Sequence, residues 1–206
     1  MITALILIVI AYLLGSIPFG YLIVRAKVRD DVRDSGSGGT GATNVTRRAG
    51  KLAGLFTLLL DATKGAVAVV LAKWMLGSNE ANLVIALSGI AVVLGHCFPI
   101  WLGFRGGKGV ATAVGVLLFL APWCLVAAGF IFIAIVSATR YVSLGSIVAT
   151  IAFPLIVLAQ NYWAKSIHGL RYVMFAGIGA GLIVIIRHQP NIERLLRGTE
   201  SKITRR

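Results

Sequence analysis

Charged residues are scarce in this chain: Asp, Glu, Lys and Arg together make up 13% of its 206 residues, about half the share that a soluble domain carries. Hydrophobic residues make up 58%. A surface that faces water needs more charge than this, so the composition excludes a soluble enzyme and a disordered chain. It indicates a membrane protein.

Cysteine is scarce as well, since the chain has only Cys97 and Cys124, and this excludes a secreted scaffold held together by disulfides. Both lie in apolar stretches, where a thiol behaves as a small hydrophobic group, and we expect no disulfide. Acidic residues number only 7 against 20 Lys and Arg. In a membrane protein such an excess more often sets orientation than binds nucleic acid, so we expect no nucleic-acid partner.

Three uncharged runs, residues 2–24, 81–104 and 141–164, are each 23 or 24 residues long. As helices they are long enough to cross a hydrocarbon core of ~30 Å. The first run has no basic segment before it and no small-residue cleavage site after it, and Arg25 and Lys27 follow at once. We therefore expect an uncleaved anchor with its N-terminus outside.

The distribution of basic residues predicts how many times the chain crosses the membrane. Only Pro122 offers a break in the uncharged stretch 109–139, which is 31 residues long. Seven crossings place 16 Lys and Arg on the cytoplasmic side and three outside, whereas six crossings leave 11 on the cytoplasmic side and eight outside. Seven fits the positive-inside rule better. The predicted spans are residues 2–24, 52–76, 81–104, 109–121, 124–139, 146–164 and 171–187.

The sequence thus predicts an all-α, polytopic membrane bundle of seven helices, with its N-terminus outside and its C-terminus in the cytoplasm. We expect one domain over residues 1–206, with its chemistry on the cytoplasmic face, because the polar loop residues gather there.

The first cytoplasmic loop, residues 35–48, has four glycines within six residues, followed by paired arginines. Such a loop can turn its backbone amides toward an anion, so the composition predicts a phosphate site rather than a flexible connector. Its candidate binding residues are Ser37, Gly38, Gly41, Thr43, Asn44 and Arg47. Residues 36–41 also match the dinucleotide pattern G-x-G-x-x-G, but that pattern requires a preceding strand, and here membrane helices flank it.

The second cytoplasmic loop, residues 103–109, presents Gly106, Gly107 and Lys108. It matches a Walker A loop poorly, because Leu102 stands where the first glycine belongs and Gly109 follows the lysine, which argues against a nucleoside triphosphatase. A mobile glycine turn that offers cations to a phosphate is the functional interpretation. An anchor set by the positive-inside rule is the alternative.

The remaining cytoplasmic segments add Ser143, Ser146, His188 and Asn191. Taken alone, a histidine at a membrane boundary is more often an interfacial residue than a catalyst. Asp61 and Lys64 share one face of a membrane helix, where charges are costly unless paired. The pair can either form a salt bridge that stabilises the bundle or take a direct part in binding, and the sequence does not decide between these two roles. Gly15, Pro18 and Gly20 predict packing and a kink in the first helix, and Gly177 with Gly181 predicts close helix packing.

Six motifs in order resemble one known family: G-S-G-G-T-G-A-T-N at 36–44, D-A-T-K-G at 61–65, L-G-H-C-F-P at 94–99, G-F-R-G-G-K-G-V-A-T at 103–112, S-L-G-S at 143–146 and R-H-Q-P-N-I at 187–192. Together they are similar to the PlsY-type glycerol-3-phosphate acyltransferases of bacteria. One departure is visible, because Gly39 stands where the family usually has Asn.

The resemblance implies an enzyme of the bacterial inner membrane that transfers an acyl group from acyl phosphate to glycerol 3-phosphate, giving lysophosphatidic acid and phosphate. It implies a site on the cytoplasmic side, no cofactor or metal, and a chain that functions as a monomer in the bilayer. The family's functional positions fall on Ser37, Arg47, Lys108, Ser146, His188 and Asn191. Of these, Ser37, Lys108, His188 and Asn191 are the expected catalytic residues.

Both substrates are anions, so a site rich in cations and poor in carboxylates offsets their mutual repulsion. Acyl phosphate is already activated and requires no covalent enzyme intermediate. We therefore expect direct attack by the glycerol hydroxyl, with the donor's phosphate accepting the proton and His188 as a hydrogen-bonding group, although His188 is the competing base. The alternative from another class is an inner-membrane transporter of an organic phosphate or lipid.

Overall fold

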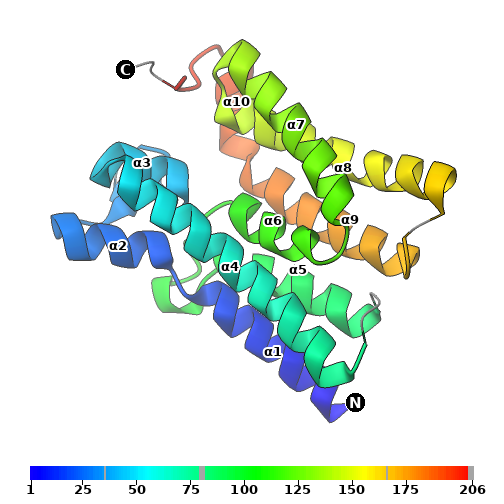
Figure 1. Ribbon diagram of the computed structural model, residues 1–206. Coiled ribbons are helices and arrows are strands. Elements are labelled where there is room, and N and C mark those ends of the chain that lie inside the picture. The colour runs from blue at the N-terminus through cyan, green and yellow to red at the C-terminus, as the bar shows by residue number, and fades with distance from the viewer. Residues whose placement is uncertain (35, 79–81, 166, 204–206) are drawn as a thin grey trace.

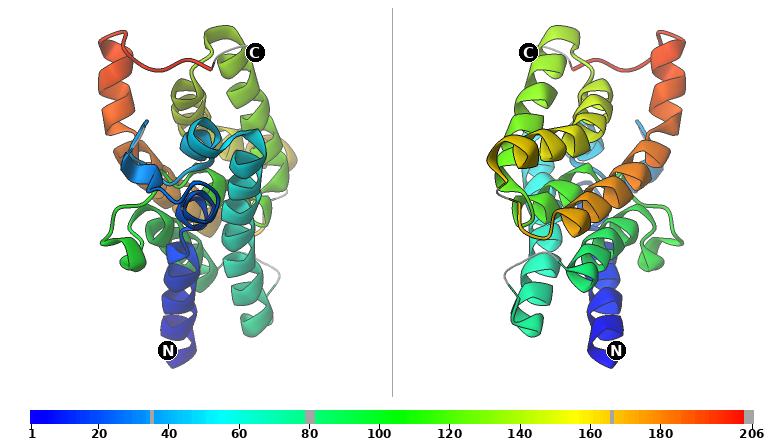
Figure 2. Two further views of the ribbon diagram at one scale, coloured as in Figure 1. Left: turned by 90° about the vertical axis from the view of Figure 1, so that its left-hand side faces the viewer. Right: turned by 90° about the vertical axis from the view of Figure 1, so that its right-hand side faces the viewer.

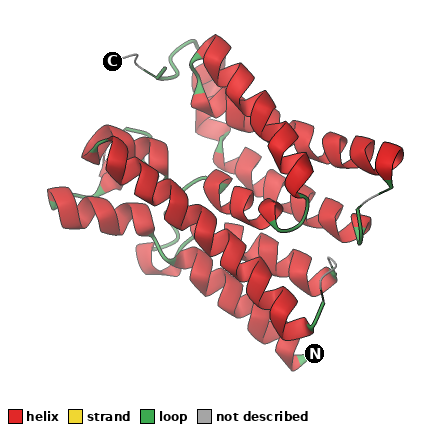
Figure 3. Cartoon of the chain, viewed as in Figure 1, coloured by secondary structure: helices red, strands yellow, loops and turns green. Residues whose placement is uncertain are grey.

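The computed structural model describes residues 1–34, 36–78, 82–165 and 167–203. Ser35 of the first loop, Ala81 of the predicted third span, and Arg205 and Arg206 lie outside the described residues. Within the described ranges the chain is helical and contains no strand (Figure 3). The helices are α1 (Ile2–Ser16), α2 (Phe19–Val28), α3 (Ala42–Ala49), α4 (Lys51–Leu76), α5 (Leu83–Cys97), α6 (Val110–Leu118), α7 (Pro122–Thr139), α8 (Val142–Ala164), α9 (Leu170–Arg187) and α10 (Gln189–Leu196), with short 3-10 turns η1 (Val32–Asp34) and η2 (Ile100–Leu102).

Local sequence signals explain several helix ends. Asn82 precedes α5, and its side-chain oxygen accepts a hydrogen bond of 3.0 Å from the backbone amide of Ile85. Pro122 opens α7, where its missing N–H costs nothing. Gly77 ends α4 in the left-handed conformation, with φ of 59°. The helix boundaries therefore follow ordinary capping chemistry.

The helices pack around three pairs: α1 with α5, α4 with α6, and α7 with α8, while α9 joins α5 to α8 (Figure 1). Small residues permit the closest contacts. A Cβ on Gly15 would collide with the backbone of Val92, and one on Gly95 would collide with the backbone of Tyr12, so α1 and α5 touch backbone to backbone. Gly177 similarly lies against the Phe153 ring between α8 and α9, as the spacing with Gly181 predicts.

Many exposed side chains of these helices are large and apolar. Trp74, Phe130, Leu155 and Leu182 are among them, and each is more than half exposed. Water would not tolerate such a surface, whereas lipid does. Cys97 and Cys124 are buried in two separate apolar clusters.

Six described segments are long and apolar enough to cross a membrane: Ile2–Val28, Lys51–Leu76, Leu83–Leu102, Pro122–Thr139, Val142–Ala164 and Leu170–Arg187. The predicted span 109–121 is wrong as a single helical crossing. Its helix, α6, has 9 residues, which corresponds to about 14 Å and is too short to cross the bilayer alone. The glycine-rich segment before α6 is not helical, and Gly109, with φ of 84°, is the N-cap residue of α6.

The first crossing contains a break. The helical backbone ends at Ser16 and resumes at Phe19, because Pro18 has no N–H to continue the ladder. The Lys64 ammonium of α4 donates a 2.9 Å hydrogen bond to the carbonyl of Ile17 at this break. The predicted kink is thus confirmed, and a buried cation stabilises it.

The start of α1 and the C-terminal helix α10 lie at opposite ends of the molecule, in Figure 1 and in both views of Figure 2. Residues at the start of α4, in the loop before α6, at the start of α8 and at the junction of α9 with α10 line one common cavity. The polar loop residues therefore meet at one end of the bundle.

Candidate functional site

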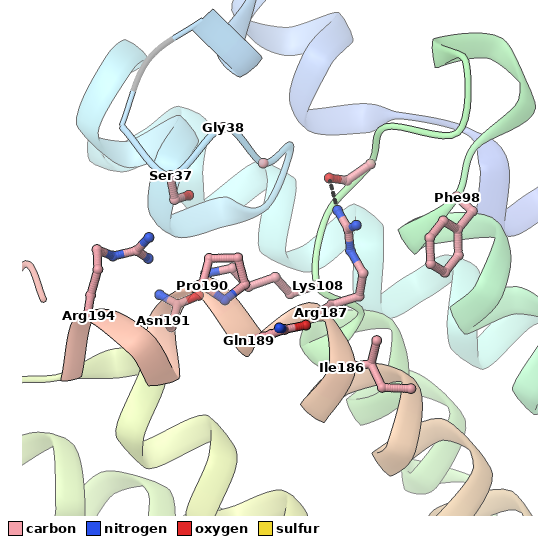
Figure 4. Close-up of a pocket in the computed structure, with 12 residues that line it drawn as sticks. Ser37, Gly38, Phe98, Lys108, Ile186, Arg187, Gln189, Pro190, Asn191 and Arg194 are labelled. Atoms are coloured by element: carbon pink, nitrogen blue, oxygen red, sulfur yellow. Dashed lines mark hydrogen bonds between the residues drawn. The ribbon is translucent and has the colours of Figure 1, made fainter. Parts of the chain in front are cut away.

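Two adjoining cavities, with volumes of about 500 and 320 Å³, occupy this end. Five residues line both of them: Ser37, Gly39, Lys108, Asn191 and Arg194. The smaller cavity is shown in Figure 4. The structure brings all twelve predicted site residues to one cavity or the other: Ser37, Gly38, Gly41, Thr43, Asn44, Arg47, Gly106, Gly107, Lys108, Ser146, His188 and Asn191.

Asn44 organises the first glycine loop from within. Its side chain is buried, and Nδ2 donates to the carbonyl oxygens of Val32 (2.8 Å) and Gly39 (2.9 Å). Its Oδ1 accepts from the backbone amide of Ser37 at 3.2 Å. The Asn44 amide therefore positions Ser37.

Gly39 lies between the first and second loops. A Cβ at this position would meet the Gly106 oxygen at 3.8 Å and Ser37 Oγ at 3.9 Å, which are ordinary contacts. The position therefore has room for the first atom of a side chain. With glycine at position 39, no side chain from this position joins the two loops.

The second loop is pinned, not mobile as expected. The amides of Gly106 and Gly107 donate to the carbonyls of Cys97 (3.2 Å) and His96 (3.1 Å) at the end of α5. The Arg187 guanidinium donates to the oxygens of Gly107 (3.1 Å) and Gly106 (3.3 Å), and the second of these bonds is the dashed line in Figure 4. The two glycines thus fix the loop by their backbones, and their amides are already used.

Lys108 extends from this pinned loop into both cavities. Burial is the main reason that the pKa of its ammonium is lowered to about 8; Glu200 opposes this shift, and the nearby Arg194, Arg47 and Arg187 contribute to it. The charged form of such a lysine is stabilised when an anion binds next to it. Lys108 is therefore suited to receive a phosphate group.

His188 has its ring orientation and its tautomer fixed by the backbone. It is 2% exposed, and its Nδ1 lies 2.7 Å from the carbonyl oxygen of Val184. A carbonyl can only accept, so Nδ1 carries the proton. Burial lowers the pKa of this imidazole to about 4. At neutral pH the ring is therefore uncharged, and Nε2 is left as a hydrogen-bond acceptor at the larger cavity.

Ser146 and Arg47 both line the larger cavity, from α8 and α3 respectively. Ser146 is buried in the first turns of α8, and its hydroxyl donates to the carbonyl of Val142 at 2.9 Å. Its oxygen can still accept a hydrogen bond. Arg47 is exposed on α3 and faces the cavity from the side of the first loop.

A buried charge cluster forms one wall of the larger cavity. Asp61 pairs with Lys64 at 2.8 Å and lies 3.4 Å from His96 Nδ1. Asp61 and His96 both line the cavity, while Lys64 turns toward Ile17. The salt-bridge interpretation of the Asp61–Lys64 pair is therefore confirmed, while a direct role in binding stays a prediction for Asp61, which borders the cavity. A Cβ on Gly107 would collide with His96 Nε2, so glycine is required beside this histidine.

The larger cavity also has an apolar side. Leu55 and Leu58 of α4, Val110 and Ala111 of α6, and Phe132 of α7 line it. Leu55 and Leu58 are about half exposed on the outer surface of α4. The cavity thus joins a cationic end to a lipid-facing apolar wall.

Several residues at the site were not predicted from the sequence. The motifs did not single out His96, Arg187, Arg194 or Glu200, and Ser143 was named only as a residue of a cytoplasmic segment. Glu200 accepts hydrogen bonds from Ser143 Oγ (2.8 Å), Asn191 Nδ2 (2.7 Å) and Arg194 Nε (2.7 Å). Only the low overall count of acidic residues could have singled it out.

The family model described as "Glycerol-3-phosphate acyltransferase" matches residues 5–198 of this chain. The chain belongs to the glycerol-3-phosphate acyltransferase family. Family members similar to it include the glycerol-3-phosphate acyltransferases of Anaeromyxobacter sp. (strain Fw109-5), 42% identical over 97% of this chain and 96% of the relative, and of Geobacter sulfurreducens (strain ATCC 51573 / DSM 12127 / PCA), 46% identical over 98% of each.

Two crystal structures from this acyltransferase family share the fold. Both are of PlsY, described as an integral membrane glycerol 3-phosphate acyltransferase, one in its glycerol 3-phosphate form and one in its lysophosphatidic acid form. Their TM-scores are 0.88 and 0.85, at 40% identity, covering 98% of this chain and 96% of each PlsY chain. This acyltransferase is therefore an integral membrane protein of phospholipid biosynthesis. The comparisons give no support to the transporter alternative.

Proposed function

We propose that this acyltransferase takes the acyl group of acyl phosphate and places it on a hydroxyl of glycerol 3-phosphate, giving lysophosphatidic acid and inorganic phosphate. The observation that carries this proposal is the larger cavity, which joins Lys108 and Arg47 to an apolar wall. Acyl phosphate matches this cavity, because it has an anionic phosphate head for the cations and an apolar acyl chain for the apolar wall. We place its head near Lys108 and its chain along Leu55, Leu58 and Phe132.

In this reaction the hydroxyl oxygen bonds to the acyl carbon, and the bond between that carbon and the phosphate oxygen breaks. The proton of the hydroxyl ends on the departing phosphate, so atoms and charges balance. An imidazole with a pKa of about 4 is a weak base, whereas a phosphate monoester has a second pKa of about 6. We infer that the donor's phosphate takes the proton during the transfer, and that in the bound substrate, before the transfer, His188 Nε2 accepts a hydrogen bond from a glycerol hydroxyl and orients it.

The cations hold the two anionic substrates together and stabilise charge that develops on the carbonyl oxygen and on the leaving phosphate. Lys108, Arg47 and Ser37 are assigned to the phosphates, and Ser146 to a substrate oxygen. Gly38, Gly41, Thr43, Gly106 and Gly107 shape the two loops. His188 and Asn191 are assigned to the hydroxyls. No cofactor and no nucleic acid takes part.

We propose seven crossings, the fourth of which runs from Gly109 at the larger cavity through α6. The start of α4 borders the larger cavity, and at its other end Lys73 Nζ donates a 2.7 Å hydrogen bond to the carbonyl of Phe119, just after α6. The chain has therefore moved from one end of α4 to the other. An odd number of crossings also agrees with α1 and α10 lying at opposite ends (Figure 2).

In this topology the N-terminus is outside, the C-terminus is cytoplasmic, and the site opens to the cytoplasm of the bacterial inner membrane. Residues 1–206 act as one domain and as a monomer, since the cavity walls come from segments spread over residues 36–201 of one chain. Reporter fusions after residues 30, 106 and 200 should read cytoplasmic, and fusions after residues 77 and 119 should read external. A fusion after residue 200 that reads external would contradict the seven-crossing topology.

The deciding assay uses the purified protein in detergent, where no compartment exists. Consumption of acyl phosphate should require glycerol 3-phosphate, and one phosphate should be released for each lysophosphatidic acid formed. Acyl-CoA and acyl carrier protein should give little turnover. Comparable rates with acyl-CoA would overturn the donor assignment, and consumption of acyl phosphate without an acceptor would overturn the transfer reaction.

A further inference from the structure

The side-chain amide of Asn191 has one orientation imposed on it. Its neighbour, Glu200, presents a carboxylate oxygen at 2.7 Å, and a carboxylate can only accept hydrogen bonds. The amide must therefore turn its NH2 group toward Glu200. Its carbonyl oxygen, Oδ1, is left on the other side of the amide.

Asn191 Oδ1 is buried, since the residue is 3% exposed, and among the described residues it has no hydrogen-bond partner. A buried carbonyl without a partner is unfavourable and uncommon in folded proteins. Asn191 lines both cavities, and it points from α10 toward the loop of Ser37 and Gly38 (Figure 4). The unsatisfied oxygen is thus a hydrogen-bond acceptor at the reaction site, and its partner must be a donor.

Glu200 is itself held firmly. It accepts from Ser143 Oγ at 2.8 Å at the start of α8 and from Arg194 Nε at 2.7 Å. The segment beyond it is tied down by two hydrogen bonds between Arg140 and Ile203, of 2.9 and 3.2 Å. The carboxylate is therefore fixed relative to both α8 and α10, and can impose an orientation on Asn191.

A second acceptor lies close by in the chain. His188 precedes Asn191 by three residues, at the start of the same helix, and its neutral Nε2 is also an acceptor. Of the two proposed substrates, acyl phosphate has no hydroxyl, whereas glycerol 3-phosphate has two. Phosphate oxygens are acceptors and would be repelled by Asn191 Oδ1. The two acceptors therefore match the glycerol hydroxyls and no part of the acyl donor.

We propose that Glu200 is a positioning residue for the acyl acceptor: it turns the Asn191 amide so that Oδ1 receives a hydrogen bond from a hydroxyl of glycerol 3-phosphate. This inference rests on the proposed function. Glu200, whose carboxylate is held by Ser143 and Arg194, thereby takes part in recognising the acceptor substrate through Asn191.

The test exchanges donor and acceptor between the two residues. In Asn191→Asp two carboxylates face each other, so kcat/KM for glycerol 3-phosphate should fall about 100-fold. In the double variant Asn191→Asp with Glu200→Gln, the new amide donates to the new carboxylate, whose other oxygen again faces the cavity. This variant should regain about tenfold over Asn191→Asp. A double variant that is no better than Asn191→Asp would overturn the proposal.

Two further variants separate positioning from simple support of the fold. Ser143→Ala removes one hydrogen bond to Glu200, and should raise KM for glycerol 3-phosphate about threefold while leaving KM for acyl phosphate unchanged. The matched control is Glu193→Gln, an exposed carboxylate on α10 outside both cavities, which should change neither constant. Equal changes in both KM values for Ser143→Ala, accompanied by a lower unfolding temperature, would contradict the proposal. A wild-type enzyme that does not acylate glycerol 3-phosphate would instead overturn the proposed function.

Discussion

His188 donates its Nδ1 proton to the carbonyl oxygen of Val184, one turn earlier in α9, at 2.7 Å. Burial lowers the pKa of the imidazole to about 4, although this hydrogen bond opposes the shift, so Nε2 is unprotonated at neutral pH. The tautomer therefore restricts His188 at neutral pH to accepting a hydrogen bond.

The pH profile of His188→Gln tests this role. Because burial lowers the pKa, the neutral ring persists as pH falls until about 4, so the wild-type rate should show no His188 limb between pH 5 and 8. Gln can present an acceptor oxygen and should retain about tenfold more activity than His188→Ala. A limb near pH 6.5 that disappears in His188→Gln would show that the imidazole is a general base instead.

Lys108 should govern the alkaline side of the profile. Its pKa of about 8 in the free enzyme means that the ammonium loses its proton as pH rises through 8, so kcat/KM should fall there. A bound phosphate raises the pKa, which moves the limb of kcat to higher pH. Lys108→Arg should abolish the limb, since a guanidinium does not titrate in this range. Lys108→Ala should lose on the order of 2 to 4 kcal/mol of transition-state stabilisation, measured as kcat/KM. A limb that persists in Lys108→Arg would contradict the assignment.

Arg47 and Arg48 form a matched pair of neighbouring arginines. Arg47 lines the larger cavity, whereas Arg48 pairs with Asp30 away from it. Arg47→Ala should therefore reduce kcat/KM at least about 100-fold, while Arg48→Ala should stay within about threefold of wild type, as for a surface ion pair. Steady-state kinetics with both substrates distinguishes them. Equal losses of kcat/KM in the two variants would mean that the overall positive charge of this region, and not the position of the Arg47 guanidinium at the cavity, supports the reaction.

Gly107 should not tolerate a methyl group. A Cβ there would collide with His96 Nε2, so Gly107→Ala must displace the loop that carries Lys108, and activity should fall at least about tenfold. The control is Gly129→Ala in α7, where a Cβ meets no atom of the described chain within 4 Å. That variant should keep its activity and unfold at the same or a higher temperature. A fully active Gly107→Ala enzyme would show that the pinned loop is not needed.

Composition and charge determined much of this architecture, because the cost of burying charge in lipid depends on each residue alone. The long apolar runs predicted the six helical segments that are long and apolar enough to cross a membrane, and Pro18 predicted the break in the first. The polar residues that meet at the cavities could also be named, since glycines, hydroxyls and cations in loops suit phosphate wherever the chain folds. Local patterns, however, could not show that α6 is too short to cross the bilayer alone.

Only the tertiary structure decided how these residues are oriented. Arg187 and Gly107 are 80 positions apart in the sequence, and Glu200 and Ser143 are 57 positions apart, yet each pair forms a hydrogen bond. No local spacing in the sequence encodes such contacts. His96 gained its place when α4, α5 and the second loop came together around Asp61. The carbonyl of Val184 determines which ring nitrogen of His188 carries the proton, and the carboxylate of Glu200 determines the orientation of the Asn191 amide. Hydrogen-bond direction depends on the assembled geometry, so sequence identified the groups at the site, and the fold determined which of them donate and which accept.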